Sequence, residues 1–419
     1  MFDDSLYKNT EGVLADFKLV IGGVDFKKSI TMDVAYCLAT NRANDYSYAN
    51  LISKMFFPLQ CNSFDEVIVK NDIVFSNWND RKDYDELVLL IQNDIPGSCY
   101  VKIKEVFSRK LNFKSIFDLD LWRAALSCKI GFKAKLLILS RLMDYVNAYK
   151  SFAKQIKINK IDLSKKKYIP FNSSYGLENA LTQFMNHQGC RTFHLCHGLH
   201  FSPNYRFFSV DAYNKKLIEA GAILSWSQSF VDNDVCKTRI HNIVGNPKYP
   251  YRNIDISFKT DSCVVFLARG QYDNNNIKLL EVLNQYSLEH NLAVTIKPHP
   301  TDNIVLFNKM CESFGFELCL NKTIKELLDS NSYGFAISYE STAYFEAMYY
   351  NLVCFRYSYE ENESYGDLDN RFLTAEDLDN QISKYSKLDK NTLNKGIMKT
   401  LTYELGMGVN NYHEVIVNN

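Results

Sequence analysis

The sequence predicts an α/β protein made of two doubly wound domains that face a cleft. Short apolar segments alternate with helical segments from residue 168 onward, a spacing that indicates parallel strands joined by right-handed crossovers. Residues 243–254 contain two of the chain's eight prolines and a glycine, which is typical of a linker between two such series. The length of 419 residues allows two or three domains.

The first series defines an amino-terminal domain, residues 1–242. Its expected strands are 17–21, 66–69, 168–171, 191–196 and 222–226, and its expected helix is 177–187. Between about residues 84 and 156, apolar residues recur at three- and four-residue spacing, which predicts a helical insertion. This insertion is rich in Lys and Arg. A solvated helical face is the simpler interpretation, and a membrane-surface or acceptor-binding insertion is the alternative.

The second series defines a carboxyl-terminal domain, residues 243–390. Its expected strands are 263–268, 292–296, 334–337 and 353–357, and its expected helices are 276–288, 305–314, 323–329 and 341–350. The remaining residues, 391–419, are expected to contain a helix that packs back on the first domain.

Composition and charge exclude several classes of protein. Lys+Arg and Asp+Glu both number 48, so the whole chain has no field that would recruit nucleic acid. Eleven scattered cysteines without a CxxC pair favour a reducing cytosol over a disulfide framework. The first residues lack the layout of a signal peptide, and the apolar runs are far shorter than the ~20 residues that span a bilayer. Neither a GxGxxG nor a P-loop pattern is present, so dinucleotide redox chemistry and ATP hydrolysis lose their usual signatures.

A predicted strand end leads into a helix near Ser341-Thr342. The strand ends at Ser338, a turn containing Glu340 follows, and Ser341 is a candidate N-cap. Free N–H groups at a helix start suit a phosphate, and Glu346, about one turn further, could reach ribose hydroxyls. The alternative is an ordinary capped helix.

The segment Lys297-Pro298-His299-Pro300 follows the predicted strand 292–296. Strand carboxyl ends in open α/β sheets point at the ligand crevice, and the two prolines restrict the turn. His299 could donate to a phosphate or titrate near neutral pH. The alternative is a rigid loop with a surface histidine.

Two charged residues are further candidates. Arg269 follows the predicted strand 263–268 and could neutralise a phosphate. Glu178 lies at the start of the predicted helix 177–187 and is a candidate carboxylate base. The simpler interpretation of Glu178 is the acidic charge that is common at helix starts.

Three histidines lie within seven residues, at His194, His197 and His200. Their spacing and the lack of a thiolate pair argue against a zinc site. Gly198 permits a tight turn after the strand, which would present His197 as a general base or charge stabiliser. No metal site is expected.

The order of these motifs resembles bacterial GT-B glycosyltransferases of surface-polysaccharide synthesis, for capsule and O-antigen. The group includes sialyltransferases, Kdo transferases of lipopolysaccharide and CDP-glycerol glycerophosphotransferases. The resemblance rests on His197-Gly198, the Val-Gly-Asn-Pro run 244–247, the Lys-Pro-His-Pro run 297–300, and Ser341-Thr342 with Glu346. It covers roughly residues 168–357.

The resemblance implies a role for each matched motif. His299-Pro300 and Ser341-Thr342 would contact the donor phosphate, Glu346 the ribose, and His197-Gly198 the reacting centre. The acidic pair before a glycine that serves as base in the sialyltransferases has no counterpart here, so the candidate bases are His197 and Glu178. The expected donor-binding residues are Gly198, Arg269, Lys297, His299, Pro300, Ser338, Glu340, Ser341, Thr342 and Glu346.

The expected function is therefore an inverting, metal-independent transfer from a nucleotide-activated donor, a CMP-linked acidic sugar or a UDP-sugar. The acceptor, a surface glycan or lipid-linked oligosaccharide, would bind the first domain. A cytoplasmic location is expected, with peripheral contact with the inner membrane left open and no nucleic-acid partner. The alternatives are a sugar-nucleotide epimerase, a CDP-glycerol glycerophosphotransferase, or a non-catalytic protein that binds glycans or nucleotides.

Overall fold

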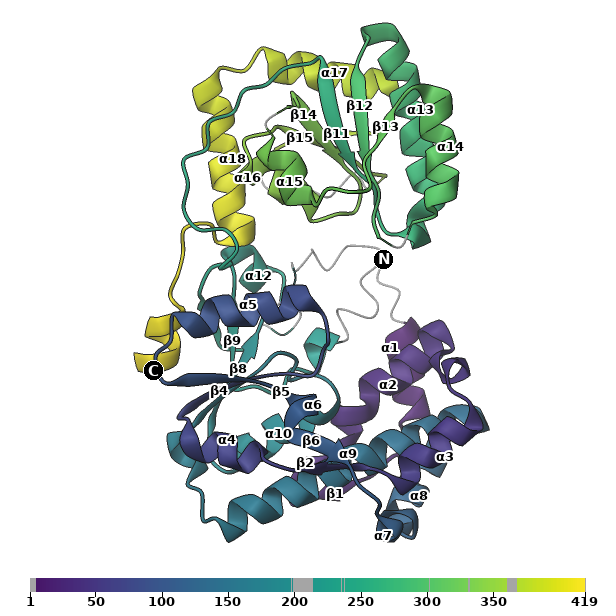
Figure 1. The fold of residues 1–419 in the computed structure, drawn as a ribbon, viewed down its shortest axis with the longest axis vertical. Coiled ribbons are helices and arrows are strands. Elements are labelled where there is room, and N and C mark those ends of the chain that lie inside the picture. Colours follow the sequence, from purple (N-terminus) through teal and green to yellow (C-terminus); the bar gives the residue numbers. More distant parts are fainter. Residues whose placement is uncertain are drawn as a thin grey trace. The chain divides into compact units, whose positions relative to one another are not determined.

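The chain folds into two compact α/β units. The computed structural model describes residues 5–196, 198, 214–234, 236, 238–300, 302–330, 332–359 and 368–418. Unit 1 comprises Met1–Lys248 and Val409–Asn419, and unit 2 comprises Tyr249–Gly408. Each unit contains a six-stranded parallel sheet covered by helices (Figure 1). The predicted fold class, two doubly wound α/β domains, is confirmed, whereas the cleft between them stays a prediction.

The sheet of unit 1 has the strand order β10-β9-β8-β7-β4-β5. Its strands are β4 (Ile73–Asn77), β5 (Ser98–Lys102), β7 (Lys167–Pro170), β8 (Arg191–Leu195), β9 (Ala222–Ser225) and β10 (His241–Ile243). β4 and β7 are neighbours although residues 78–166 separate them in sequence. From this pair the chain adds β5 on one side and the later strands on the other, so the strand order reverses between β4 and β7.

Two strand predictions in unit 1 need correction. Residues 66–69 belong to helix α4 (Phe64–Lys70), and the strand, β4, follows it. The error arises because a short apolar run is compatible with either a helix or a strand. The predicted strand 17–21 is reduced to β1 (Val20–Ile21), which forms a small antiparallel pair with β2 (Val24–Asp25).

The predicted helical insertion, residues 84–156, also differs from the structure. Its first part contains α5 (Lys82–Asn93), which packs on the main sheet, and β5, which is a strand of that sheet. The next strand, β6 (Phe107–Arg109), pairs with β3 (Leu59–Cys61) in a separate two-stranded sheet. The helical part comprises α7 (Phe113–Ile116), α8 (Leu119–Ser127) and α9 (Phe132–Ile158). Helix α9 packs against α8, α2 (Phe26–Thr40) and α3 (Tyr48–Phe56), and α7 packs against α3 and α9.

Helix α9 combines a buried face in the core with a more exposed face that carries lysines. Half of its 27 residues are buried, from Leu136 to Ile156. Across the described part of the chain, no helix is both long and apolar enough to cross a membrane.

The sheet of unit 2 has the order β13-β12-β11-β14-β15-β16, with every pair parallel. Its strands are β11 (Ser262–Phe266), β12 (Ala293–Lys297), β13 (Glu317–Leu318), β14 (Phe335–Ser338), β15 (Cys354–Tyr357) and β16 (Arg371–Phe372). Its helices are α13 (Asp273–His290), α14 (Ile304–Phe314), α15 (Ile324–Asp329), α16 (Ala343–Tyr349), α17 (Ala375–Ser386) and α18 (Lys390–Leu405). The strand order reverses between β11 and β14. The predicted strands and helices of this region are present, with small differences at their ends.

The carboxyl-terminal segment departs from its prediction. Helix α18 belongs to unit 2, where it packs against α16. Its apolar side chains, such as Leu393, Ile397 and Leu401, recur every four residues and therefore need one apolar partner face. Only Val409–Asn419 returns to unit 1, where buried Tyr412 donates a hydrogen bond to the Gly245 carbonyl at 3.0 Å.

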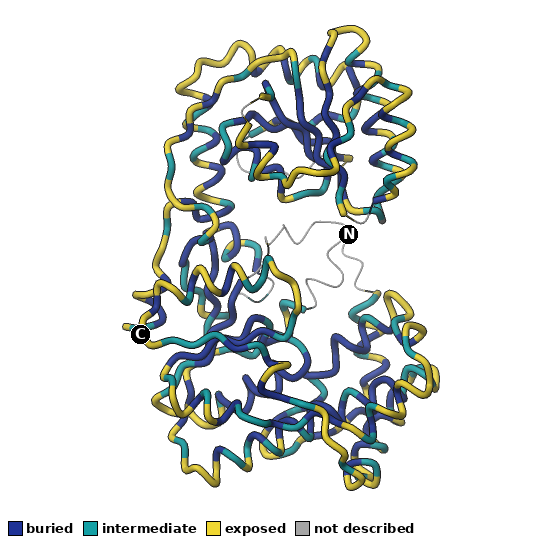
Figure 2. The backbone as a smooth tube through the Cα atoms, viewed as in Figure 1, coloured by how far each residue is buried: buried dark blue, intermediate teal, exposed yellow. Residues whose placement is uncertain are grey.

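The cores are built around the central strands of each sheet, which are buried in both units (Figure 2). In unit 1, Phe64 of α4 is fully buried. Its ring centroid lies 5.7 Å from that of Phe107, 5.1 Å from that of Phe152 and 6.1 Å from that of Tyr168. Phe64 therefore joins α4, β6, α9 and β7 into one core.

We expect Phe64→Ala to lower the free energy of unfolding of unit 1 by about 3–5 kcal/mol, because it removes buried area and leaves a cavity. The three tryptophans, Trp78, Trp122 and Trp226, all lie in unit 1, so urea unfolding followed by tryptophan fluorescence reports this unit. The matched control is Phe117→Ala, because Phe117 is 77% exposed and its loss should change stability by less than about 0.5 kcal/mol. Equal effects of the two substitutions would contradict this account of the core.

Candidate functional site

The strand-order reversal of unit 1 holds a small pocket. Ligands of doubly wound sheets bind outside the carboxyl ends of the strands at such a reversal. Here the pocket is lined by Trp78, Asn79, Tyr145, Asn172, Tyr175, Gly176, Leu177 and Glu178. Trp78 directly follows β4 and Asn172 lies two residues after β7, so the pocket lies at the carboxyl ends of these two strands. Its volume of about 30 Å³ has room for water-sized groups.

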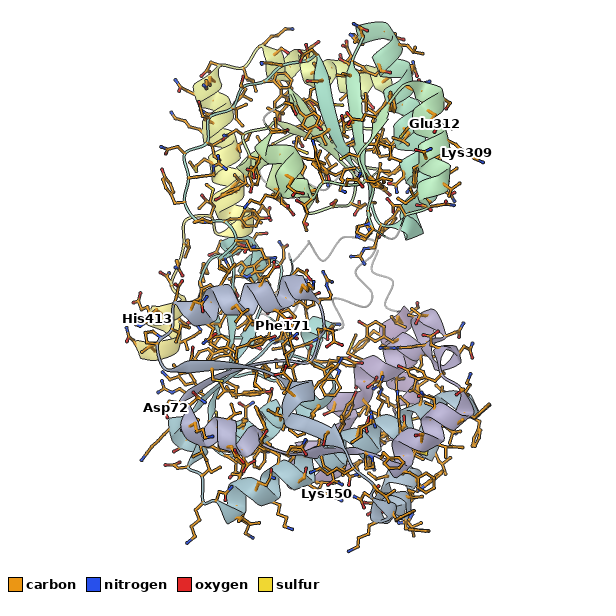
Figure 3. The ribbon with its side chains drawn as sticks, viewed as in Figure 1. Asp72, Lys150, Phe171, Lys309, Glu312 and His413 are labelled. Carbon is orange, nitrogen blue, oxygen red and sulfur yellow. The ribbon has the colours of Figure 1, made fainter. Side chains whose placement is uncertain are left out.

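Glu178 is the titratable group of this pocket. It lies in the first turn of α10 (Gly176–His187) and is 2% exposed. Its Oε1 accepts hydrogen bonds from Ser76 Oγ at 2.8 Å and from the backbone N–H of Phe171 at 3.3 Å. Ser76 belongs to β4, and Phe171, labelled in Figure 3, directly follows β7. Both strands at the reversal therefore hold the same carboxyl oxygen.

Burial determines the acidity of Glu178. Loss of water raises its pKa to about 7, although the hydrogen bonds from Ser76 and from backbone N–H groups act in the opposite direction. A carboxyl group with this pKa can accept or release a proton near neutral pH, which is what a general base requires.

The turn before α10 depends on glycine. Gly176 has a φ of +62°, and a Cβ there would lie 3.2 Å from the Tyr145 hydroxyl. A left-handed backbone and a close side chain both favour glycine. This turn leads into α10, whose Glu178 accepts the hydrogen bond from Ser76.

A second polar group adjoins the pocket and was missed by sequence reasoning. The hydroxyls of Tyr145 and Tyr175 donate to the two oxygens of buried Asp33 at 3.0 and 3.1 Å, and Arg141 Nε lies 3.5 Å from Asp33. Burial raises the pKa of Asp33 despite the nearby Arg141. These residues are far apart in sequence. The available signal was a single charged residue among the mostly apolar residues 30–37.

In unit 2, strand register brings several predicted donor-binding residues to one edge. Phe266 of β11 is opposite both Lys297 of β12 and Ser338 of β14, so these two residues end their strands on either side of β11. Arg269 lies three residues after Phe266 and is exposed. The structure therefore places Arg269, Lys297 and Ser338 at the carboxyl edge, where the strand order reverses.

The turn that contains His299 is held by a residue that the sequence did not indicate. The backbone N–H of His299 donates to Asp302 Oδ2 at 2.7 Å. Burial raises the pKa of Asp302 to about 6. His299 is half-buried and Pro300 is exposed. Lys297 Nζ donates to the Cys319 carbonyl at 3.4 Å, so part of its hydrogen-bonding capacity is used inside the unit.

The turn after β14 is strained and differs from its prediction. Glu340 has a φ of 46°, a left-handed conformation that non-glycine residues rarely adopt and that costs about 1–3 kcal/mol. Helix α16 begins at Ala343, with Thr342 and not Ser341 as its N-cap, and Thr342 makes no side-chain cap bond. Ser341 Oγ instead accepts from the Ala343 N–H at 3.3 Å. Glu346 lies in the first turn of α16 and is half-buried.

The histidine cluster is only partly described. His197 and His200 lie outside the described residues, and Gly198 is exposed. His194 is buried at the end of β8, where its Nδ1 lies 3.0 Å from Ser173 Oγ. His194 therefore has a structural partner within unit 1.

Neither a protein-family model nor a curated protein matches this chain. Among solved structures, it is similar to a Staphylococcus aureus TarM variant in complex with fondaparinux, α-GlcNAc-glycerol and UDP, at 13% identity and a TM-score of 0.40 over 63% of this chain. That match spans 56% of TarM, little more than half its length. The S. aureus MnaA–UDP structure is similar at 11% identity and a TM-score of 0.47, over 83% of this chain and 95% of MnaA. The UDP-GlcNAc 2-epimerase of Neisseria meningitidis, bound to UDP-GlcNAc, is similar at 11% identity and a TM-score of 0.44, over 83% of this chain and 98% of the epimerase. At identities this low, the likeness assigns no reaction to this chain.

We expect the free energy of unfolding of unit 1 to depend on pH through the titration of Glu178. Between the ordinary pKa of 4.5 in the unfolded chain and the pKa of about 7 in the folded chain, the folded chain retains a proton that the unfolded chain releases. Stability therefore falls as pH rises through this window. Glu178→Gln should remove that loss, so the variant should gain about 3 kcal/mol relative to wild type between pH 4 and pH 8. Urea unfolding followed by tryptophan fluorescence measures the difference, and a difference that is independent of pH would contradict the assignment.

Proposed function

We propose that this chain transfers a sugar from a nucleotide-activated donor to a hydroxyl group of an acceptor, with inversion at the anomeric carbon. One observation carries the proposal. The carboxyl group of Glu178 is buried at the strand-order reversal of unit 1, lines a pocket there, and has a pKa near 7. A group of this kind supports base catalysis on a weakly acidic hydroxyl.

The proposed step moves one proton and exchanges one bond. Glu178 takes the proton of the acceptor hydroxyl, the acceptor oxygen forms a bond to the anomeric carbon, and the bond from that carbon to the phosphate oxygen breaks. Ser76 and the Phe171 N–H hold one oxygen of the carboxylate in place. Because the base and the leaving group act on opposite faces of the sugar, the configuration inverts.

The leaving phosphate would be stabilised at the carboxyl edge of unit 2. Arg269, Lys297 and His299 supply positive charge or donors there, and preorganised charge lowers the energy of a developing phosphate anion. Glu346 would hold the ribose, and the strained turn at Glu340 would shape the phosphate site with Ser338, Ser341 and Thr342. We propose that these groups replace a metal ion, so EDTA should leave the rate unchanged.

The finer assignments belong to the same proposal. The donor would be a UDP-sugar or a CMP-linked acidic sugar, and the acceptor a bacterial surface glycan or its lipid-linked precursor. Product analysis with donor alone tests the class of reaction. Turnover of the donor without acceptor, giving a sugar-nucleotide epimer, would replace transfer by epimerisation.

We expect one of UDP, GDP, CDP or CMP to raise the thermal unfolding temperature of the chain. A ligand at 100 times its Kd stabilises the folded state by about 2.7 kcal/mol. Arg269→Ala and His299→Ala should weaken this shift, whereas Lys309→Ala should not, because Lys309 is exposed on α14 away from the strand ends (Figure 3). If no nucleotide stabilises the wild-type chain, the proposed donor class is wrong.

We expect kcat/KM to rise with pH and to level off above about pH 7, because Glu178 must lose its proton before it can act as base. Glu178→Gln should lower kcat by about 10²–10⁴-fold, the usual contribution of general base catalysis. Glu312→Gln is the matched control, since Glu312 is an exposed glutamate of α14 (Figure 3). A Glu178→Gln variant with a wild-type rate and pH profile would overturn the role of Glu178.

A further inference from the structure

Helices α3, α7 and α8 and the start of α9 carry exposed apolar side chains, here named the apolar-basic surface. Its apolar members are Tyr48, Ile52, Phe57, Leu111, Phe113, Phe117, Leu119, Leu126 and Phe132. Phe117 is 77% exposed and Leu119 is 64% exposed. Single exposed apolar residues are ordinary on protein surfaces. Here, however, nine of the 23 large apolar side chains exposed among the described residues fall within two short segments, 48–57 and 109–135.

These helices are neighbours within unit 1. Helix α3 packs against α7 and α9, and α8 packs against α9 (Figure 1). The rings of Phe56 and Phe113 lie 5.9 Å apart, which joins the end of α3 to α7. At the other end of α3, Lys133 of α9 lies 5.6 Å from the ring of Tyr48. The exposed side chains therefore form one region of the unit.

Helix α8 shows that packing does not use all of its apolar residues. Leu121, Ala124 and Ala125 are buried and form its inner face. Leu119, Arg123 and Leu126 are exposed, and their spacing of four and three residues places them together on the outer face. A helix in contact with water usually has a polar outer face. The two outer leucines, Leu119 and Leu126, can therefore contact an apolar surface outside this unit.

The same segments are strongly basic. Residues 48–57 and 109–135 contain eight Lys and Arg and two Asp, an excess of six positive charges, in a chain whose total charge is zero. The basic residues are Lys54, Arg109, Lys110, Lys114, Arg123, Lys129, Lys133 and Lys135. Arg109 is held by Asp144, Lys129 pairs with Asp16, and Arg123 lies near Asp120. Lys110 and Lys114 are exposed and flank Leu111 and Phe113.

We propose that the apolar-basic surface binds the surface of an anionic lipid bilayer. Its phenylalanine and leucine side chains would enter the boundary between headgroups and acyl chains, and its lysines would contact lipid phosphates. Lysine suits this position because its apolar stem lies along the acyl region while its ammonium group stays at the headgroups. A protein partner is disfavoured, because protein interfaces are depleted in lysine at their centres. This inference does not depend on the proposed catalytic role of Glu178.

The test is co-sedimentation of the full chain with vesicles. Phosphatidylcholine vesicles that contain phosphatidylglycerol should bind the chain, pure phosphatidylcholine vesicles should bind it far more weakly, and added salt should release it. Phe117→Ser combined with Leu119→Ser should weaken binding about ten-fold through lost apolar burial. Lys110→Gln and Lys114→Gln should each weaken it about five-fold.

Matched controls separate the surface from general effects. Leu288→Ser with Val305→Ser removes two equally exposed apolar side chains of unit 2, and Lys309→Gln removes one exposed charge. Both control variants should bind vesicles as the wild type does. Tryptophan-monitored urea unfolding of the unit 1 variants should match wild type, which shows that their fold is intact.

Three outcomes would overturn the proposal. One is the absence of binding to anionic vesicles, and another is equal binding by the unit 1 variants and the wild type. The third is a concentration-dependent dimer in light scattering that the unit 1 variants abolish, since that would assign the surface to a second copy of this chain.

Discussion

The parallel pairing of β4 with β7 is the contact on which the site in unit 1 depends. The two strands are separated in sequence by residues 78–166, and a parallel pair can form only if the intervening chain crosses back over the sheet. Helix α9 makes most of that return, and its buried residues supply much of the core against which α2, α3 and α10 pack. The pairing places Ser76 of β4 beside the Tyr168 hydroxyl, at 2.8 Å, and beside Glu178. Without it, the carboxyl group would have neither its burial nor its hydrogen bonds.

Both units retain an unfavourable feature at the edge where their strand order reverses. In unit 1 it is a carboxyl group whose ionised form is penalised by burial. In unit 2 it is the left-handed backbone of Glu340 together with the buried carboxyl of Asp302. Features of this kind persist only where surrounding packing stabilises them, and they cluster at sites of binding and catalysis. These features mark the two edges at which we propose that the chain binds its ligands and reacts.

The segment between β4 and β7 combines two roles. Its inner side chains complete the core of unit 1, whereas its outer side chains supply six of the nine apolar residues of the apolar-basic surface, those from Leu111 to Phe132. A basic and apolar exterior on the same unit as Glu178 suits an enzyme whose acceptor is attached to lipid, because membrane binding concentrates enzyme and acceptor on one surface. The neutral charge of the whole chain conceals this asymmetry, which becomes visible only when charge is counted by segment.

Local pattern alone determined most of unit 2. Its strands and helices are regular in length, and each apolar run is bounded by turn residues, so the sequence was sufficient to predict β11, β12, β14 and β15 and to place Arg269, Lys297 and Ser338 at their carboxyl ends. The sequence was insufficient where one pattern fits two structures, as in residues 66–69, and where a helix must select its partner, as in α18. Tertiary structure alone decided the state of Glu178, which in sequence is an ordinary acidic residue at a helix start. It also decided the contact of Asp33 with Tyr145 and Tyr175. Burial and long-range pairing set the charge and neighbours of a side chain, and these depend on residues far away in the chain.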